Sequence, residues 1–280
     1  MSANLASFRG QWFVVKIGGE LVRPGGLDGV AEAVRAFAEA GVKVCVVHGG
    51  GPQATALTER LGLAPVKIAG RRVTDEKVLQ VMKMTLAGEV SVDVVAELRR
   101  LGVNAVGLHG ISGHLIHSTR RPPKKITGGP PEPVDLGLVG DVHAINVHLL
   151  DTLAAAGYVP AVASIGGDDE GGVFNINADV VASKLAAKVG AAKLLLVSGV
   201  PGVMKDPKDP ATRIPMLTPV TAKENIDGGV ITGGMIPKVE EALDGLEAGI
   251  GAVHVCGSTP GSVLSEAIEP GSSGTAFLPA

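Results

Sequence analysis

Aromatic side chains are nearly absent from this sequence. Phe, Trp and Tyr together make up 2% of the 280 residues, whereas apolar residues as a whole make up 45%. A core of this size must be filled mainly by small aliphatic side chains, as is typical of helices packed on a parallel sheet. Proteins that bind single-stranded nucleic acid stack its bases on aromatic rings, so the composition argues against that class of partner.

An excess of positive charge is also missing. The formal net charge is −3, and the one basic run consists of Arg120, Arg121, Lys124 and Lys125. Binding to duplex nucleic acid or to an acidic membrane surface depends on basic patches. We therefore expect neither nucleic acid nor a membrane among the partners.

Cysteines and long apolar runs are scarce as well. Cys45 and Cys256 lie far apart, each in an apolar run, without the CxxC or histidine spacing of a metal site. This pattern predicts two reduced, buried thiols. No run approaches the roughly 18 apolar residues of a membrane span, and the N-terminus lacks the apolar stretch of a signal peptide. These features predict a cytoplasmic protein.

Several common fingerprints are missing. Neither GxGxxG with an acidic ribose ligand nor GxxxxGK[ST] follows a predicted strand, which argues against a dinucleotide-dependent dehydrogenase and a P-loop enzyme. The serine elbow GxSxG and the metalloprotease pattern HExxH are absent too. We expect no metal site built from protein side chains.

The sequence does contain alternating strand and helix patterns, which predict βαβ units and a mainly parallel sheet flanked by helices. A chain of 280 residues can form one large α/β domain or two lobes that share a cleft. Strands are predicted at 12–17, 42–47, 104–108, 158–163, 193–197 and 252–256, and helices at 27–40, 75–101, 145–156, 178–189 and 237–248. The stretch 110–142, rich in Gly, Pro and His, breaks this alternation and predicts a hairpin with a polar excursion, the alternative being a domain linker.

Glycine turns follow two of the predicted strands. "KIGGE" places Gly18 and Gly19 after the first strand, and "HGGGP" places Gly49, Gly50 and Gly51 after the second. A single such turn is explained equally well by a tight strand-to-helix connection, with proline at the first helical turn. Two of them can present facing backbone N–H groups, an arrangement suited to a phosphoryl group.

Two lysines lie next to glycine pairs. Lys16 precedes the first pair, and Lys238 follows "TGGMIP" at the start of a predicted helix. Each is by itself explained as a solvated strand end or a helix residue. Together they suggest two cations that hold a phosphoryl group from opposite sides.

Polar residues cluster before the helix at 178–189. "NINAD" supplies Asn175, Asn177 and Asp179, of which one suffices to cap the helix. The others are free to bind a ligand, the lysines or a metal ion. "GRRVTD" adds Arg72 shortly before a helix cap at Thr74 or Asp75, where it can bind a carboxylate in a bidentate manner or remain a surface charge.

These motifs together resemble the amino acid kinase family. "KIGGE", "HGGGP", "GRRVTD", "AVGLHG", "LGLVGDV", "NINAD" and "GGMIPK" occur in order over nearly the whole chain. Within that family the chain resembles the members that phosphorylate the side-chain carboxylate of N-acetyl-L-glutamate in arginine biosynthesis. The resemblance implies one domain over residues 1–280, a three-layer αβα sandwich. Its N-lobe, about 1–170, binds the acyl amino acid, and its C-lobe, about 171–280, binds ATP with Mg²⁺ as co-substrate, without a prosthetic group.

The resemblance also implies roles for particular residues. Lys16 and Lys238 would stabilise the phosphoryl group during transfer, and Asp179 would orient both lysines. Gly18 and Gly19 would donate amides to phosphate. The acyl amino acid would bind at a second set of residues, which comprises Gly50, Gly51, Arg72 and Asn175.

The nucleotide is expected against two loops. These are Ser198, Gly199 and Val200 after one predicted strand, and the loop around Gly233 and Gly234. Gly199 stands where the family usually carries an aspartate, and Glu20 stands where small or amide residues are common. The contact of that aspartate with the nucleotide is therefore not expected here, and Glu20 has no assigned role.

Small molecules are the expected partners, with a homo-oligomer as the assembly. A dimer is favoured and a hexamer is possible. One alternative function is a related kinase that acts on a carrier-bound aminoadipate; another is a non-catalytic amino-acid sensor of the same fold. The joint presence of Lys16, Asp179 and Lys238 favours a catalyst over a sensor.

Overall fold

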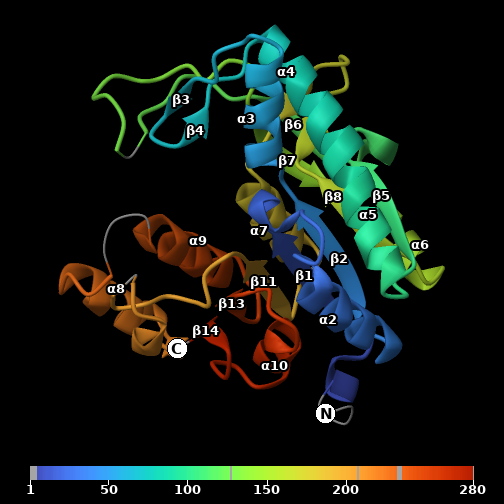
Figure 1. Cartoon of the computed structure of the whole chain (residues 1–280), viewed down its shortest axis with the longest axis vertical. Coiled ribbons are helices and arrows are strands. Elements are labelled where there is room, and N and C mark those ends of the chain that lie inside the picture. Colours follow the sequence, from blue (N-terminus) through green and yellow to red (C-terminus); the bar gives the residue numbers. More distant parts are fainter. Residues whose placement is uncertain (1–4, 127, 207, 232–234, 280) are drawn as a thin grey trace.

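A mostly parallel sheet forms the centre of the molecule (Figure 1). The computed structural model describes residues 5–126, 128–206, 208–231 and 235–279. Within these residues the main sheet has eight strands in the order β12-β14-β13-β11-β1-β2-β8-β5. Their bounds are Met216–Leu217 (β12), Gly274–Phe277 (β14), Val253–Cys256 (β13), Lys193–Val197 (β11), Trp12–Ile17 (β1), Lys43–His48 (β2), Val159–Ala163 (β8) and Ala105–His109 (β5). All six strands predicted from the sequence are present, with ends within one residue of the prediction.

Strand register brings the glycine turns to one edge of this sheet. Ile17, the last residue of β1, pairs with His48 at the end of β2 on one side and with Val197 at the end of β11 on the other. The strand order reverses at β1, because β2 lies on one side of it and β11 on the other. In open α/β sheets such a point at the carboxyl ends of the strands is where ligands bind.

Helices cover both faces of the main sheet and create two separate cores. Side chains of β1 alternate between them: Trp12 and Val14 belong to one core, and Phe13 and Val15 to the other. The first core includes side chains from α6 (Val147–Ala155), α7 (Ala178–Lys188), α8 (Pro219–Asp227) and α9 (Ile236–Glu247), and the second from α2 (Asp28–Glu39), α5 (Ser91–Arg100) and α10 (Ser262–Ile268). The expected three-layer αβα sandwich is therefore confirmed.

The predicted hairpin is present and belongs to a second sheet. β6 (Ile116–Arg120) and β7 (Gly140–Ile145) pair in antiparallel fashion. They join β9 (Ile165–Gly167) and β10 (Val173–Asn175) in the order β10-β9-β6-β7, which the sequence patterns did not predict because β9 and β10 are only three residues long. A short hairpin, β3 (Lys67–Ile68) and β4 (Arg71–Arg72), lies beside the excursion between β6 and β7 and next to α3 (Gly51–Arg60) (Figure 1).

The predicted helix at 75–101 is helical throughout but changes its winding. Asp75 caps α4 (Glu76–Met82) by accepting a hydrogen bond from the Val78 N–H at 2.8 Å. A π-helical segment, Lys83–Val90, then connects α4 to α5. Gly50 packs here, since a Cβ at that position would lie 3.0 Å from Cγ2 of Val90. The other four predicted helices correspond to α2, α6, α7 and α9, whereas α8, α10 and the short 3₁₀ turns at Ala6–Phe8, Gly19–Leu21, Ser112–His114 and Pro210–Thr212 were not predicted.

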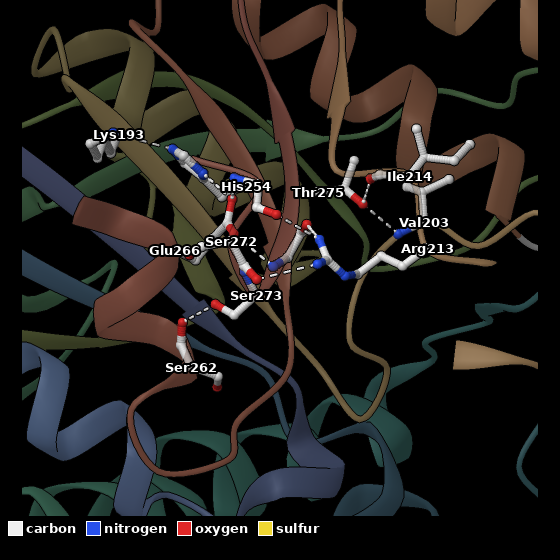
Figure 2. Close-up of polar contacts among 12 residues, drawn as sticks. Lys193, Val203, Arg213, Ile214, His254, Ser262, Glu266, Ser272, Ser273 and Thr275 are labelled. Carbon is white, nitrogen blue, oxygen red and sulfur yellow. Dashed lines mark hydrogen bonds and ion pairs between the residues drawn. The ribbon is translucent and has the colours of Figure 1, made fainter. Parts of the chain in front are cut away.

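A buried polar network ties the C-terminal residues to the sheet (Figure 2). His254 and Glu266 are both 0% exposed, and His254 Nδ1 donates to Glu266 Oε1 at 2.9 Å. The other carboxylate oxygen accepts the N–H of Gly274 at 2.6 Å. Lys193 Nζ donates to Nε2 of the histidine at 3.4 Å, because an ammonium group can only donate. The network therefore contains a neutral imidazole between an ammonium group and a carboxylate.

The hydrogen bonds of this network set its protonation state. Burial alone would raise the pKa of Glu266, but hydrogen bonds from His254 and from the Gly271 amide outweigh it, so the pKa lies below its usual value. Burial lowers the pKa of His254.

Cys45 and Cys256 are both buried free thiols, as the sequence predicted, and burial raises the pKa of each.

Over the described ranges, we find no helix whose length and hydropathy suit it to cross a membrane.

Candidate active site

The two glycine turns are in direct contact at the carboxyl edge of the main sheet. A Cβ on Gly19 would lie 3.0 Å from Cα of Gly50 and 3.0 Å from Cδ of Pro52. Gln53, in the first turn of α3, holds the contact in place by donating from Nε2 to the Gly19 carbonyl at 2.7 Å. A side chain at Gly19 would crowd the backbone of Gly50 and the ring of Pro52, so glycine at this position permits the close approach of the two turns.

Backbone donors at these turns are divided between the fold and the site. The N–H of Gly18 donates to the Val197 carbonyl at 3.1 Å, so the sheet occupies an amide that the resemblance assigned to phosphate. Gly19 and Glu20 begin a 3₁₀ turn, and Gly51 begins α3 with Gly50 as its N-cap and no side-chain cap. The first N–H groups of a helix have no acceptor within it. The amides of Gly19, Glu20 and Gly51 are therefore the donors that an anion can use here.

Lys16 and Asp179 form an ion pair beside these turns. Lys16 Nζ lies 2.6 Å from Asp179 Oδ1, and the two side chains are 15% and 29% exposed. Lys16 is the penultimate residue of β1, and Asp179 is the second residue of α7. Asn177 caps α7 by accepting from the Asp179 N–H at 2.9 Å, so the cap is Asn177 and the Asp179 carboxylate is left for the lysine.

Lys238 lies in the same electrostatic environment. It is the third residue of α9, which packs beside α7. Burial lowers the pKa of Lys238, and the positive charge of Lys16 lowers it further, while Asp179 and Glu20 act in the opposite direction. The fold thus brings the two lysines and the aspartate of the sequence prediction together.

Hydrogen bonds hold Arg72 against α3 and Asn175 against Thr74. Arg72 Nη2 donates to the Gly51 carbonyl at 3.0 Å and to Thr55 Oγ1 at 2.7 Å. Its Nη1 is buried without a hydrogen-bond partner in the described parts of the chain, and burial lowers the pKa of this guanidinium. Asn175 donates from Nδ2 to Thr74 Oγ1 at 3.1 Å. Hydrogen bonds therefore fix both side chains, and Arg72 keeps one unused donor.

The loop after β11 leaves open space next to the first glycine turn. Ser198 donates its N–H to the Cys256 carbonyl at 3.0 Å, and its buried hydroxyl has no partner among the residues described. A Cβ on Gly199 would meet no atom within 4 Å. The Val200 carbonyl lies 3.8 Å from the position of a Cβ on Gly257, which follows β13. Gly233 and Gly234, expected to contact the nucleotide, lie outside the described residues.

Two further carboxylates belong to this site. The sequence patterns did not single out Glu241, and they left Glu20 without an assigned role. Glu241 lies one turn after Lys238 in α9, where burial and the charge of Asp179 raise its pKa to about 8. The Glu20 carboxylate folds back over Gly18, since a Cβ on Gly18 would clash with both of its oxygens. The i, i+3 spacing from Lys238 was the sequence signal that could have identified Glu241.

A protein-held metal centre is not apparent at the site. Across the ranges that the structure covers, no group of three or more His, Cys, Asp or Glu side chains is arranged to hold a metal ion.

Comparisons with known proteins agree with this architecture. The model of the amino acid kinase family matches residues 11–257. Acetylglutamate kinase of Anaeromyxobacter dehalogenans (strain 2CP-C) is 49% identical over 263 residues, which cover 94% of this chain and 97% of that protein. Acetylglutamate kinase of Sorangium cellulosum (strain So ce56) is 47% identical over 95% of this chain and 94% of its own length.

A solved structure has the same fold. The crystal structure of a protein from Streptococcus mutans UA159 superposes with a TM-score of 0.75 at 28% identity, covering 95% of this chain and 98% of that one. The family match spans both glycine turns, the Lys16–Asp179 pair and Lys238. The chain belongs to the amino acid kinase family.

Proposed function

We propose that this protein transfers the γ-phosphoryl group of ATP to the side-chain carboxylate of N-acetyl-L-glutamate, a step of arginine biosynthesis, and releases ADP and the acyl phosphate. The observation that carries the proposal is the 49% identity to an acetylglutamate kinase over 94% of the chain. The ion pair of Lys16 and Asp179 at the joined glycine turns supports it.

The chemistry requires no general base. A glutamate side-chain carboxyl has a pKa near 4.3 in model compounds, so the acceptor is already ionised at neutral pH. One of its oxygens forms the new bond to the γ-phosphorus while the bond to the bridging oxygen of ADP breaks, and ADP leaves with that electron pair. What remains for the protein is to position two anions and to neutralise charge, which dominates phosphoryl transfer.

Lys16 and Lys238 are proposed to stabilise the phosphoryl group as it moves. The two lysines come from different elements of the fold, Lys16 from β1 and Lys238 from α9. Asp179 fixes the Lys16 ammonium at 2.6 Å and so limits its freedom before the substrates bind. The amides of Gly19, Glu20 and Gly51 would donate to the anionic oxygens, while Gly18 supports the turn through its bond to β11.

The acyl amino acid is proposed to bind between α3 and the second sheet. The unused Nη1 of Arg72 can donate to its α-carboxylate, a charge-assisted hydrogen bond. Gly50 and Gly51 provide a backbone surface without side chains. Asn175, fixed through Thr74, has a carbonyl oxygen that can accept the amide N–H of the acetyl group. Of these residues, Gly50, Gly51 and Arg72 belong to the proposed N-lobe, about 1–170, and Asn175 lies just inside the proposed C-lobe, about 171–280.

ATP is proposed to bind at the loop of Ser198, Gly199 and Val200. The open space around Gly199 supports this placement, and the kinase family implies the use of ATP. Mg²⁺ would enter with the nucleotide, because this ion is usually held by substrate phosphates together with one or two carboxylates. It would offset the negative charge of the phosphates.

One assay tests the function directly. The protein is incubated with Mg-ATP and N-acetyl-L-glutamate, N-acetyl-L-aspartate, N-acetyl-L-aminoadipate or L-glutamate, and any acyl phosphate is trapped with hydroxylamine and measured as the hydroxamate. We expect hydroxamate with N-acetyl-L-glutamate in at least a tenfold excess over the others. Product mainly from aminoadipate would shift the substrate class, and no ADP with any acceptor would support an amino-acid sensor.

The homodimer expected from the resemblance stays a prediction. Size-exclusion chromatography with light scattering tests it: a dimeric mass would support the favoured assembly, a hexameric mass would support the other assembly that the resemblance allows, and a monomeric mass would contradict a homo-oligomer.

A further inference from the structure

A cavity lined by basic side chains lies between the β3–β4 hairpin and the excursion that connects β6 to β7 (Figure 1). Its volume is about 190 Å³. Four of the lining residues are cations, and we refer to it as the cation cavity: Arg71 comes from β4, and Arg121, Lys124 and Lys125 come from the excursion. The last three belong to the one basic run of the sequence, and the proposed kinase function assigns them no role.

The positive charge of the cation cavity is largely uncompensated. Arg121 pairs with Asp141, whose Oδ1 accepts a hydrogen bond from Nε at 2.8 Å and lies 2.7 Å from Nη2. Within the described parts of the chain, the side chains of Arg71, Lys124 and Lys125 have no ion pair or hydrogen bond, and no acidic residue lines the cavity. Like charges around a small cavity repel one another, so a multivalent anion is attracted to it.

Acidic residues of the same excursion do not supply the missing negative charge. Asp135 pairs with Arg120, whose Nη2 lies 2.8 Å from Oδ2, and its other oxygen accepts the Gly137 N–H at 2.8 Å. Glu132 is exposed to solvent and does not line the cavity. The counter-charge must therefore come from a ligand.

The cation cavity has a fixed donor and an apolar floor. The Arg121 side chain is 14% exposed, and Asp141 holds one edge of its guanidinium, which leaves the donors of Nη1 for a ligand. Ile126 and Leu136, 7% and 5% exposed, line the cavity together with Val134. A guanidinium held in place favours an anion that can accept several charge-assisted hydrogen bonds at once.

The size of the cavity limits the ligand to a small ion. Pockets for drug-sized ligands measure about 300–1,000 Å³, and the cation cavity is smaller, at about 190 Å³. A whole nucleotide or a folded protein segment is too large for it. An ion of the size of pyrophosphate or of a small tricarboxylate is suited to it.

We propose that the cation cavity is a second anion site, separate from the phosphoryl-transfer site, that binds a small multivalent anion, either a polyphosphate or a polycarboxylate. Arg121 orients the anion, and the three unpaired cations neutralise its charge. This site does not depend on the acceptor that the proposed kinase phosphorylates.

The cation cavity is connected to the proposed binding site of the acyl amino acid. Arg71 and Arg72 are neighbours in β4, so their side chains leave the strand on opposite sides, and Arg72 donates hydrogen bonds to α3. On the excursion, the Leu136 carbonyl accepts the Thr74 N–H at 2.9 Å, and Thr74 Oγ1 accepts from Asn175 at 3.1 Å. An anion that fixes the cavity walls therefore also limits the motion of Arg72 and Asn175.

Occupancy of the cation cavity should consequently strengthen binding of the acyl amino acid, a consequence that rests on the proposed function. Linkage requires the two ligands to raise each other's affinity by the same factor.

The anion site is tested by calorimetric titration with sodium pyrophosphate and, separately, with sodium citrate, at constant ionic strength and without Mg²⁺. The variant is Lys124→Gln/Lys125→Gln. The matched control is Lys184→Gln/Lys188→Gln, which removes the same charge from two exposed lysines of α7. Binding of pyrophosphate at the phosphoryl-transfer site contributes equally in all three proteins, so the difference between them reports the cation cavity. Unfolding midpoints show whether both variants are folded.

We expect wild type and control to bind at least one of the two anions about tenfold or more tightly than the variant, which has lost two charge-assisted donors. Tighter binding of pyrophosphate would identify a phosphate-type ligand, and tighter binding of citrate a polycarboxylate. Arg71→Gln should weaken the same binding event, which provides a second test if the double variant does not fold. Equal affinities in wild type, variant and control would overturn the proposal.

The connection to the acyl site is tested by titrating N-acetyl-L-glutamate into the nucleotide-free protein, with and without the better anion. In wild type and control, the anion should lower the Kd about fivefold, the low end of typical coupling between two sites, and it should have no effect in Lys124→Gln/Lys125→Gln. An unchanged or raised Kd in the wild type would refute the connection. Absence of N-acetyl-L-glutamate binding under every condition would contradict the proposed function, while the pyrophosphate and citrate titrations would still decide whether the cation cavity is an anion site.

Discussion

The ion pair of Lys16 and Asp179 allows a sharp test of whether the charge serves catalysis or only the fold. The test replaces each residue with a neutral analogue of similar size, giving Lys16→Met, Asp179→Asn and the double variant. The two atoms of the pair are 2.6 Å apart, and the side chains are 15% and 29% exposed. The change in kcat and the change in unfolding free energy should therefore both be large enough to be measured separately.

The expected loss of activity follows from the loss of one charge at the transferring group. Removing a single preorganised donor typically lowers kcat by about 10²–10³, or roughly 3–4 kcal/mol. Lys16→Met should show a loss of this size. Asp179→Asn should lose less, because it leaves the lysine charged while releasing its orientation.

The free energy of unfolding should respond to these substitutions differently from the activity. Lys16→Met leaves the Asp179 carboxylate without its partner, which costs about 1–3 kcal/mol for a partly buried charged group. The double variant removes both charges, and replacing both partners by neutral groups is often close to neutral. We therefore expect the double variant to recover most of the unfolding free energy and none of the activity.

Two measurements on each variant provide the answer: ADP release in a coupled assay, and urea unfolding followed by circular dichroism. Lys43 and Asp151 supply the control pair, with a 2.7 Å contact at the opposite end of the sheet and 36% and 43% exposure. Lys43→Met should leave kcat within about twofold, because so exposed a pair contributes little. A Lys16→Met/Asp179→Asn enzyme within tenfold of the wild-type kcat would refute the catalytic role and make the pair a structural one.

Three further predictions follow from the geometry. Gly19→Ala should lower kcat/KM by about 10–100-fold with little change in fold, because its Cβ would lie 3.0 Å from the Gly50 backbone and would push the glycine turns apart; unchanged kinetics would contradict the contact. Arg72→Lys should raise KM for the acyl amino acid about tenfold or more and leave KM for ATP unchanged, and an equal rise in both would point to a general structural role. Acid should destabilise the C-terminal network: the pKa of Glu266 is lowered in the folded protein, so its carboxylate stabilises the fold above the pKa of the unfolded chain and this stabilisation is lost as the pH falls, and the lowered pKa of His254 adds a loss of stability below about pH 6.5. In Glu266→Gln the thermal midpoint should therefore fall less steeply between pH 7 and pH 4 than in the wild type. An unchanged slope would contradict this interpretation.

Most of the main sheet could be predicted from local pattern alone. Each of the six strands is an apolar run bounded by turn residues, and such runs are buried whatever their neighbours are. The short strands β9 and β10, with three residues each, carry no such pattern. They are strands because β9 pairs with β6, a long-range contact that no local window contains, and β10 pairs in turn with β9.

The candidate site could be predicted in its residue types and less well in its hydrogen bonds. Glycine pairs next to lysines pointed to an anion site, and the structure places Lys16 beside Asp179 as expected. The resemblance assigned the Gly18 amide to phosphate, whereas the structure uses it to pair with Val197 of β11. The order of the strands in the sheet places β11 next to β1 and so decides that partner. The residues of the glycine turn do not reveal the strand order.

The sequence by itself determined the layers, the glycine turns and the family, because periodicity, backbone freedom at glycine and ordered motifs are properties of the chain. The tertiary structure decided which ionisable groups lie close enough to change one another's pKa. Glu241 is an ordinary helix residue in the sequence. Packing of α9 against α7 buries it near Asp179 and raises its pKa to about 8, because ionisation depends on the surroundings of a group in space and not on its place in the chain.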